Sequence, residues 1–341
     1  MESYRDIAEG IAAARHEGGS WIELSVDWYI RTGAKLPEPS FLRREDGQHV
    51  IYRGVPVSLI GPSEAAKSWV AAIVCNQAMY GEYDHVLYVD FEATLPVLIA
   101  RLRSLGVFDE TMLYHLHYMR PDEPMFGDKM AEARRYVKAF REQVKPAIVI
   151  LDGVTEGMAM HGLDANNGVD VAKWQGLCRD LFGLGTIEID HTGKNMKLGA
   201  VGSIHKRAGI WQQVTFQVKK KFGYGKTGRI VLKDTKDRPG ALGPIAPDGV
   251  LGELVLEANE DGTRVSWKLE LPEERAEAQV LDEAALQAKI VELILNGIDT
   301  TRALKETIGG AANAIQAAIN HLRDTGTIAR DEGPAGRWSV V

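Results

Sequence analysis

The chain has few cysteines and no long apolar run. Its two cysteines, Cys75 and Cys178, stand far apart. This separation fits neither a disulfide framework nor a metal-ligand spacing, so we expect two buried, reduced thiols. No segment approaches the roughly 20 consecutive apolar residues that a membrane-spanning helix needs, and the N-terminus is polar and charged. These absences favour a cytoplasmic protein that does not contact a membrane.

The chain also lacks an excess of positive charge. Its 40 Lys and Arg residues are outnumbered by 47 Asp and Glu, which gives a net charge of −7. This balance excludes a protein that coats nucleic acid through bulk charge, so any DNA contact must come from local basic loops. The length of 341 residues and the hydrophobic content of 45% allow one full α/β domain with a sizeable core and a smaller module.

Strand and helix patterns alternate through most of the chain. Short apolar strands, such as residues 57–60, 86–91 and 147–151, are separated by segments with helical spacing. This rhythm is typical of a parallel α/β sheet with helices on both faces. After His191 the strand patterns follow one another without helices, so antiparallel strands should extend the sheet. The predicted parts are a helical N-terminal appendage (1–48), the α/β domain (49–271), an acidic linker (272–283) and a separate module (284–341).

A phosphate-binding loop is the strongest motif. The sequence VSLIGPSEAAKSWVAAIV runs from an apolar strand through a glycine to Lys67 and Ser68 and then into a helix, the context in which a P-loop pattern has a mechanism. Loop amides would face phosphate oxygens, Lys67 would neutralise phosphate charge, and Ser68 would ligate Mg²⁺. The predicted nucleotide-binding residues are Gly61, Pro62, Ser63, Glu64, Ala65, Ala66, Lys67 and Ser68. The alternative is a glycine turn before an ordinary helix.

One position of this loop departs from the pattern. The pattern has Gly immediately before the lysine, and here the residue is Ala66. If the backbone at this position is left-handed, a β-carbon costs on the order of 1 kcal/mol or more. The change would then weaken nucleotide binding or turnover, which keeps a degenerate ATPase scaffold among the alternatives.

Two strands end in carboxylates suited to metal and water chemistry. The run AIVILDG ends a buried strand in Asp152, the Walker B arrangement, where the side chain would hold the metal's water shell. The run VLYVDFEA offers Asp90 and Glu92 for polarising an attacking water. Strand alternation puts both on the same face, so position alone does not choose between them. Each of these acids is also explained by a structural role as a cap of a turn or helix.

Five segments, taken in order, resemble the RecA-like ATPases of the RepA type: GPSEAAKS, VDFEATLPVLIARLRSLG, VILDG, IDHTGK and GSIHKRAG. That family is related to the DnaB-type replicative helicases and is frequent in plasmids and phages. The resemblance spans about residues 50–245 and implies a RecA-like fold that uses ATP and Mg²⁺. It also implies Glu92, rather than Asp90, as the catalytic base and His191 as a sensor of the nucleotide state. From the sequence alone, a single His at a strand end is as well explained by a structural hydrogen bond.

The resemblance further implies a homo-oligomer, a ring or a filament. In LKDTKDRPG, the pattern formed by Lys236, Arg238 and Gly240 resembles the motif through which DnaB-type rings insert a lysine and an arginine finger into the neighbouring subunit's site. A plain turn is the alternative, since Asp-Arg-Pro-Gly is good turn chemistry.

Single-stranded DNA is the expected ligand of two loops, residues 155–167 and 192–209, which match the loops that face the central channel in RecA-like assemblies. The first is nearly devoid of cations, which makes direct phosphate binding there doubtful. The second contains the predicted DNA contacts Lys194, Lys197, Lys206 and Arg207 on a Gly-rich background. Solvated surface loops without a ligand are the alternative for both.

The C-terminal module has three helical segments followed by a Gly-Pro turn between short strand patterns. We expect a winged helix-turn-helix, whose partner is duplex DNA or a replication protein; the sequence leaves both open. Together these expectations describe a hexameric, ATP- and Mg²⁺-dependent DNA helicase or translocase in plasmid or phage replication or recombination. The alternatives are a nucleotide-regulated recombination mediator or regulator that unwinds nothing, and the inactive scaffold.

Overall fold

The chain forms two compact units, Met1–Leu271 and Pro272–Val341. The computed structural model describes residues 26, 30–31, 33, 35–81, 84–125, 130–191, 205–271, 273–308, 312–331 and 336–341. None of the helices in these ranges combines the length and apolar character that crossing a membrane requires.

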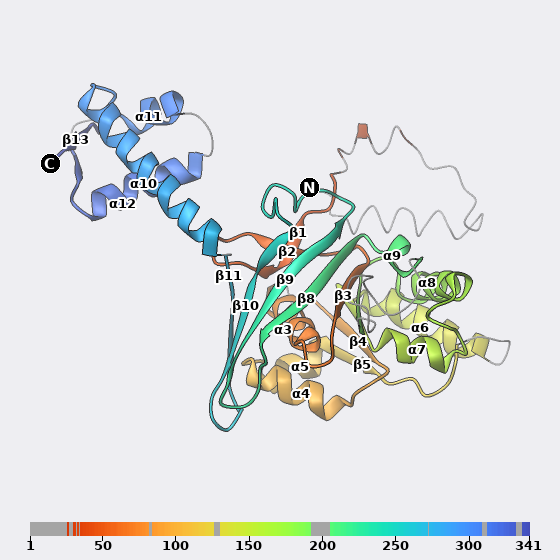
Figure 1. Ribbon diagram of the computed structural model, residues 1–341. Coiled ribbons are helices and arrows are strands. Elements are labelled where there is room, and N and C mark those ends of the chain that lie inside the picture. The colour runs from red at the N-terminus through yellow and green to blue at the C-terminus, as the bar shows by residue number, and fades with distance from the viewer. Residues whose placement is uncertain are drawn as a thin grey trace. The chain divides into compact units, whose positions relative to one another are not determined.

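A large mixed sheet is the centre of the first unit (Figure 1). Its strands in the described ranges are β3 (Val57–Gly61), β4 (Val86–Asp90), β5 (Leu116–Met119), β6 (Ile148–Asp152), β7 (Thr186–His191), β8 (Gln212–Lys220), β9 (Thr227–Asp237), β10 (Val250–Ala258) and β11 (Val265–Glu270). They lie in the order β11-β10-β9-β8-β3-β7-β6-β4-β5. From β5 to β8 neighbouring strands pair in parallel, and from β8 to β11 they pair antiparallel. The predicted α/β class, a parallel sheet extended by antiparallel strands, is confirmed.

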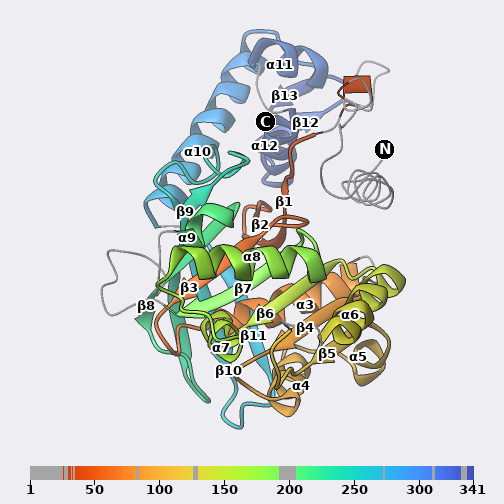
Figure 2. The same ribbon diagram turned by 90° about the vertical axis from the view of Figure 1, so that its right-hand side faces the viewer.

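Helices cover both faces of the parallel strands (Figure 2). One face carries α3 (Lys67–Gly81), α4 (Leu95–Ser104) and α5 (Asp109–His115), and the other carries α6 (Ala131–Val144), α7 (Val154–Met160), α8 (Gly168–Phe182) and α9 (His205–Gly209). Alternate residues of β6 enter two separate cores, because side chains alternate across a strand. Ile150 packs with Val70 in the first core, and Leu151 packs with Trp174 in the second.

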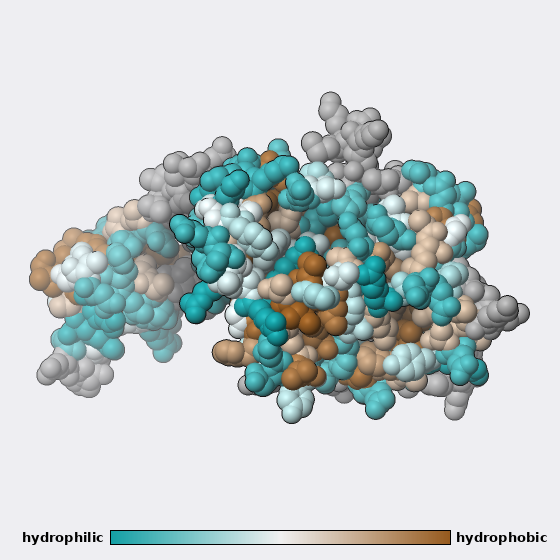
Figure 3. Space-filling view, turned by 90° about the horizontal axis from the view of Figure 1, so that it is seen from below, coloured by the Kyte–Doolittle hydropathy of each residue, from teal (hydrophilic) through white to brown (hydrophobic). Residues whose placement is uncertain are grey.

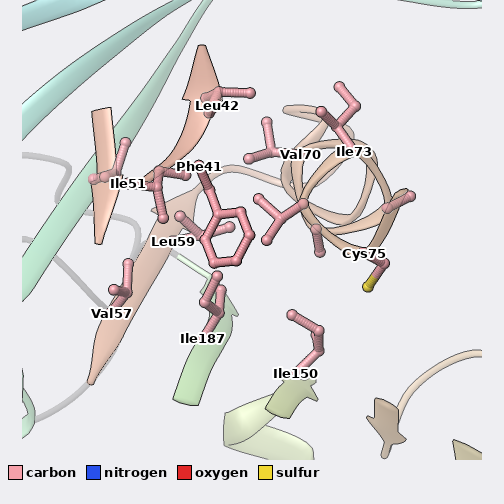
Figure 4. Close-up of a cluster of buried hydrophobic side chains, with 14 of the residues drawn as sticks. Phe41, Leu42, Ile51, Val57, Leu59, Val70, Ile73, Cys75, Ile150 and Ile187 are labelled. Atoms are coloured by element: carbon pink, nitrogen blue, oxygen red, sulfur yellow. The ribbon is translucent and has the colours of Figure 1, made fainter. Parts of the chain in front are cut away.

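A hairpin precedes the large sheet. Its strands, β1 (Pro39–Arg43) and β2 (His49–Tyr52), pair antiparallel, and Figure 4 shows Phe41 between the strands and helix α3. Phe41 and Leu42 are 5% and 0% exposed. The predicted helical appendage over residues 1–48 therefore does not hold at its C-terminal end, because burial of these two side chains makes the segment a core hairpin. Residues 1–25 lie outside the described ranges.

The second unit contains three helices and a two-stranded hairpin in its described part: α10 (Glu273–Leu295), α11 (Thr301–Ile308), α12 (Ala312–Asp324), β12 (Ile328–Arg330) and β13 (Trp338–Val340). Its core includes Ile290, Leu304, Ile319 and Trp338. The segment 273–283, part of the predicted linker, is the first half of α10. Its Glu, Ala, Gln and Leu residues are strong helix formers, and no Gly or Pro interrupts them.

Candidate active site

The sequence-predicted site residues gather at one edge of the sheet, where the parallel strands end. The register places Gly61 of β3 opposite His191 of β7, and Asp90 of β4 opposite Asp152 of β6. Because β7 also pairs with β6, the four strand ends are contiguous. Ligands of open α/β sheets bind outside this carboxyl edge. The structure thus brings the phosphate loop and three of the predicted side chains to a plausible binding edge.

The phosphate loop has an unusual backbone for residues that carry a β-carbon. Glu64 and Ala66 have φ angles of 61° and 65°, in the left-handed region. The condition under which the Ala66 β-carbon is costly is therefore met, and strain on the order of 1 kcal/mol is stored at this position. Gly61, by contrast, is required by space: a β-carbon there would lie 2.8 Å from Cβ of Phe216.

The Lys67 ammonium is folded back onto its own loop. It donates hydrogen bonds to the backbone oxygens of Gly61 (2.9 Å) and Pro62 (2.8 Å). Burial lowers the pKa of Lys67, and the nearby carboxylates, Glu92 foremost, oppose that shift. A phosphate that enters the loop would replace two neutral acceptors by charged ones, which make stronger hydrogen bonds with an ammonium.

Asp152 is a buried carboxylate with little compensation. It is 3% exposed, and its Oδ2 accepts a 2.6 Å hydrogen bond from the hydroxyl of Tyr88. Burial raises the pKa of Asp152, and the negative charges of Asp90 and Glu92 add to this rise against the hydrogen bond from Tyr88. A cation placed beside Asp152 would stabilise its charged form.

Asp90 and Glu92 have different surroundings. Asp90 is 1% exposed, and its oxygens accept from the amides of Glu92 (3.0 Å) and Ala93 (2.6 Å) and from the hydroxyl of Tyr118 (3.0 Å). Its carboxylate is therefore engaged in holding the turn after β4. The Glu92 side chain is 48% exposed, with Oε2 3.5 Å from Nε2 of His191. Of the two acids, Glu92 is the one that faces solvent.

His191 stands between the phosphate loop and Glu92. Its Nδ1 lies 3.4 Å from Oγ of Ser63, while its Nε2 faces the Glu92 carboxylate. A change at the loop can therefore reach Glu92 through a single imidazole ring. The contact with Ser63 escapes sequence analysis, because only the sheet register brings the loop after β3 beside the end of β7.

The residues present fit a magnesium ion that a nucleotide brings with it. Ser68 is the second residue of α3, and Asp152 supplies a buried carboxylate whose pKa is raised by burial. Mg²⁺ in phosphate sites keeps several waters and takes only one or two protein ligands besides phosphate oxygens. Within the described ranges, no group of three or more His, Cys, Asp or Glu could hold a metal by itself.

Glu156 is a further acid that sequence analysis does not single out. It lies in the first turn of α7, and its Oε2 is buried without a hydrogen-bond partner among the described residues. Its charge contributes to the field around Lys67. One sequence signal could have identified Glu156, its position four residues after Asp152. Because a helix begins at Val154, the chain turns there and keeps Glu156 near the end of β6.

Lys236 and Arg238 lie against α9 of their own chain. The Lys236 ammonium donates to the backbone oxygen of Arg207 (2.5 Å), and Arg238 donates to that of Ala208 (3.0 Å). The Arg238 guanidinium also lies 5.7 Å from the ring centroid of Trp211. Both cations, from the end of β9 and the turn after it, therefore contact the backbone of α9.

Asp237, between these two cations, forms the turn that the sequence indicates. Its carboxylate accepts from the amides of Gly240 (2.9 Å) and Leu242 (2.8 Å) and from the hydroxyl of Tyr52 (2.8 Å). The turn chemistry is thus present, and it presents Lys236 and Arg238 from an ordered backbone.

The predicted DNA contacts differ in their surroundings. Lys194 and Lys197 lie outside the described residues. Lys206 does not meet the expectation of a mobile surface cation: it is 9% exposed and its ammonium is 2.7 Å from Oδ2 of Asp190, because that buried acid requires a counter-ion. Arg207 is exposed, and its guanidinium donates to the backbone oxygen of Thr235. The loop expected at 155–167 is helical in its first part, as α7.

Comparison with known proteins assigns no family. No family model matches the chain, and no curated protein matches it. Among the solved structures that match is a KaiC-like protein from the hyperthermophilic archaeon Pyrococcus horikoshii, with a TM-score of 0.45 and 14% sequence identity over 68% of this chain and 98% of the other. A likeness this remote does not assign a function.

Proposed function

We propose that the chain is a Mg²⁺-dependent ATPase of the RecA-like kind. One observation carries this proposal: the phosphate loop, the buried Asp152 and the Glu92–His191 pair meet at the carboxyl edge of a parallel sheet. A loop followed by a helix N-terminus, with a lysine and a hydroxyl in its first turn, suits a triphosphate. The excess of carboxylate over cation at this edge suits a ligand that brings its own divalent metal.

Each side chain has a defined part in hydrolysis. Lys67 would leave its two loop carbonyls for the β- and γ-phosphates, and Ser68 would ligate Mg²⁺, whose water shell Asp152 would hold. When bound, the metal neutralises charge on the phosphates. Glu92 would accept a proton from the water that attacks the γ-phosphorus, and ADP and phosphate would leave. His191, in contact with both Ser63 and Glu92, would report the γ-phosphate.

We also propose that the ATPase is a homo-oligomer, a hexameric ring or a filament, in which Lys236 and Arg238 reach the neighbouring subunit's nucleotide. The ordered turn at Asp237 supports this role, because a finger must be presented at a fixed position. Large apolar side chains exposed near α5, namely Phe108, Leu113 and Tyr114 at 68%, 82% and 74%, are of the kind that subunit contacts cover. Figure 3 shows apolar side chains gathered near the centre of one face, with hydrophilic ones around them.

The partner we propose is single-stranded DNA, bound through Arg207 and the basic segment 192–204, with helicase or translocase activity in plasmid or phage replication. The sequence resemblance supports this part. In the second unit, three helices followed by a hairpin support a winged helix. Lys305 donates to Gln316 (2.7 Å), and Gln316 donates to Asn320 (3.3 Å), which forms a polar row that suits duplex DNA or a replication protein.

A second candidate function is a nucleotide-regulated DNA-binding protein with little turnover, a recombination mediator or a scaffold. The strained Ala66 favours this reading, because a β-carbon at a left-handed position destabilises the loop conformation.

Phosphate release from Mg·ATP, with and without single-stranded DNA, tests the proposal, and displacement of a strand from a forked duplex tests unwinding. We expect DNA-stimulated turnover that Lys67→Ala abolishes and that Lys138→Ala, a surface control, does not change. Turnover with stimulation but no displacement would select the mediator. Nucleotide binding without turnover would select the scaffold, and no nucleotide binding would reject the assignment.

A further inference from the structure

A buried ion pair connects three elements beside the candidate active site. The Lys206 ammonium of α9 lies 2.7 Å from Oδ2 of Asp190 in β7 and 3.2 Å from the hydroxyl oxygen of Thr155 in α7. That hydroxyl donates to Oδ1 of Asp190 at 2.7 Å. The side chains of Lys206 and Asp190 are 10% and 5% exposed. Burial of a charged pair gives little net stability, so its clearest structural effect here is to join α9, β7 and α7.

One end of this pair reaches the nucleotide edge. Oδ1 of Asp190 accepts a 2.9 Å hydrogen bond from the backbone amide of His191, and the His191 ring contacts Ser63 of the phosphate loop and Glu92. Asp190 therefore holds the backbone of the residue that lies between the loop and the proposed base.

The other end reaches the proposed finger residues. The two residues after Lys206 accept hydrogen bonds through their backbone oxygens. The oxygen of Arg207 accepts from the Lys236 ammonium, and the oxygen of Ala208 accepts from the Arg238 guanidinium at 3.0 Å. A displacement of α9 would therefore remove acceptors from both cations at once.

We propose that Lys206 is a positioning residue. Its ion pair with Asp190 fixes α9, and α9 in turn holds Lys236 and Arg238 at a fixed position relative to the carboxyl edge of the sheet. The path runs from Ser63 through His191, Asp190 and Lys206 to α9 and the finger residues. Its meaning for catalysis rests on the proposed ATPase function, whereas the mechanical link does not. Lys206 itself touches no nucleotide in this arrangement.

The charge of Lys206 is needed by more than one acid. Glu188, two residues before Asp190 on the same face of β7, is buried, and the charge of Lys206 acts on it. Burial and the charge of Asp190 raise the pKa of Glu188 to about 7, and Lys206 opposes this rise. Loss of the ammonium would leave two buried acids uncompensated, so a test must separate loss of positioning from loss of the fold.

Hydrogen exchange of the full chain without nucleotide tests the link directly. Lys206→Met should accelerate amide exchange at least about tenfold in peptides that cover 206–211 and 234–239, and leave the peptide over 57–68 unchanged. Lys138→Met, which breaks the exposed pair with Asp180, is the matched control and should change neither. Asp190→Asn/Lys206→Met, which removes both charges, should fold and still show the same local acceleration. Unchanged exchange at 206–211 and 234–239, or equal acceleration in all three peptides, would overturn the proposal.

Turnover supplies a second readout. Lys206→Met should lower kcat by about 10- to 100-fold, because a small misplacement of a catalytic group has effects of this size. The KM for Mg·ATP should change less than about twofold, since no nucleotide contact is lost. Lys206→Arg, which keeps the charge, should recover most of kcat. A matching loss in Lys206→Arg, or a change in KM alone, would contradict positioning. An inactive wild-type chain would reject the ATPase, while the exchange result would still decide the link.

Discussion

The two halves of the large sheet handle charge in opposite ways. In the antiparallel extension, Glu253 is paired with Lys219 (2.5 Å) and Arg229 (2.8 Å), and Glu270 with Arg229 (3.1 Å) and Lys268 (2.5 Å). Although burial acts to raise it, the hydrogen bonds from Lys219 and Arg229 bring the pKa of Glu253 below its ordinary value. These two carboxylates are balanced by the chain itself. Asp234 of β9 is an exception in this region: its Oδ1 is buried without a hydrogen-bond partner among the described residues, and burial raises its pKa to about 6.

At the carboxyl edge of the parallel half, the charges are not balanced. The pKa of Asp152 is raised by burial, Glu156 has a buried oxygen without a hydrogen-bond partner in the described chain, and Lys67 is hydrogen-bonded to backbone oxygens instead. The backbone at Ala66 is also strained. Uncompensated charge and strain gather where a ligand completes the arrangement. The comparison therefore separates the charge cluster around Glu253 and Glu270, which is complete on folding, from an edge where the proposed Mg·ATP would supply the missing partners.

The largest expected effect concerns Arg238. It follows strand β9 of the antiparallel extension, and we propose that it acts at the carboxyl edge of a neighbouring subunit. Arg238→Ala should lower kcat by about 10³-fold or more, because a finger stabilises the charge of the transition state. Phosphate release measures this. Mixing Arg238→Ala with Lys67→Ala subunits should restore part of the turnover, since some sites then combine one intact loop with one intact finger. No recovery at any mixing ratio would argue against a shared site.

The next effect tests the exposed acid of the unbalanced edge. Glu92→Gln should lower turnover by about 10²- to 10⁴-fold, the range expected for loss of a general base, while affinity for a non-hydrolysable ATP analogue is retained. Single-turnover phosphate release and equilibrium binding measure the two quantities. Asp90→Asn should instead lower the free energy of unfolding, because its carboxylate holds the turn. Normal turnover in Glu92→Gln would remove Glu92 from its role.

The pH dependence of the free energy of unfolding compares Glu188, a buried acid with a raised pKa, with Glu253, an acid that is paired with two cations. Because the folded-state pKa of Glu188 is raised from 4.5 to about 7, the unfolded chain loses this proton first. The free energy of unfolding should therefore fall by up to about 3 kcal/mol as pH rises from about 4.5 to 7. Glu188→Gln should flatten this part of the curve in urea denaturation.

Glu253→Gln is the matched comparison for this series. The lowered pKa of Glu253 gives stability that is present above the unfolded pKa and lost as pH falls. Its removal should therefore reduce the stability lost on acidification, the opposite sign from Glu188. The same sign for both variants would contradict the contrast between the two halves.

The smallest expected effect is relief of strain in the phosphate loop. Ala66→Gly should raise the free energy of unfolding by about 1 kcal/mol, because it relieves the strain of a β-carbon at a left-handed position. Ala65→Gly is the control: the φ angle of Ala65 is not positive, so this change should give no gain. Urea denaturation measures both. Equal stabilities of wild type and Ala66→Gly would show that this position carries no strain, and robust turnover in both would also remove the argument for a scaffold.

Local chemistry explains which expectations could be made from the sequence. The phosphate loop, the strand ending in Asp152 and the antiparallel extension are contiguous patterns of apolar residues, glycine and charge, so they can be read without the fold. Sequence spacing does not separate Asp90 from Glu92, since both share a face; the structure distinguishes them through Tyr118 and two amides. The hairpin at Phe41 was not predicted, because it depends on burial of Phe41 and Leu42 in the core. The helix at 273–283 was not predicted either, because the acidic composition of this segment obscured its helix propensity.

The sequence by itself determined the class of the sheet, the place of the nucleotide edge and the residue types available there, because each depends on neighbours along the chain. Only the tertiary structure decided how those residues are partnered. Lys206 reads as a basic loop residue, yet β7 and α9 bury it against Asp190, and the carbonyls of α9 receive two cations from β9 and its following turn. Such pairings join residues distant in sequence, and they follow from burial and register, which the sequence does not display.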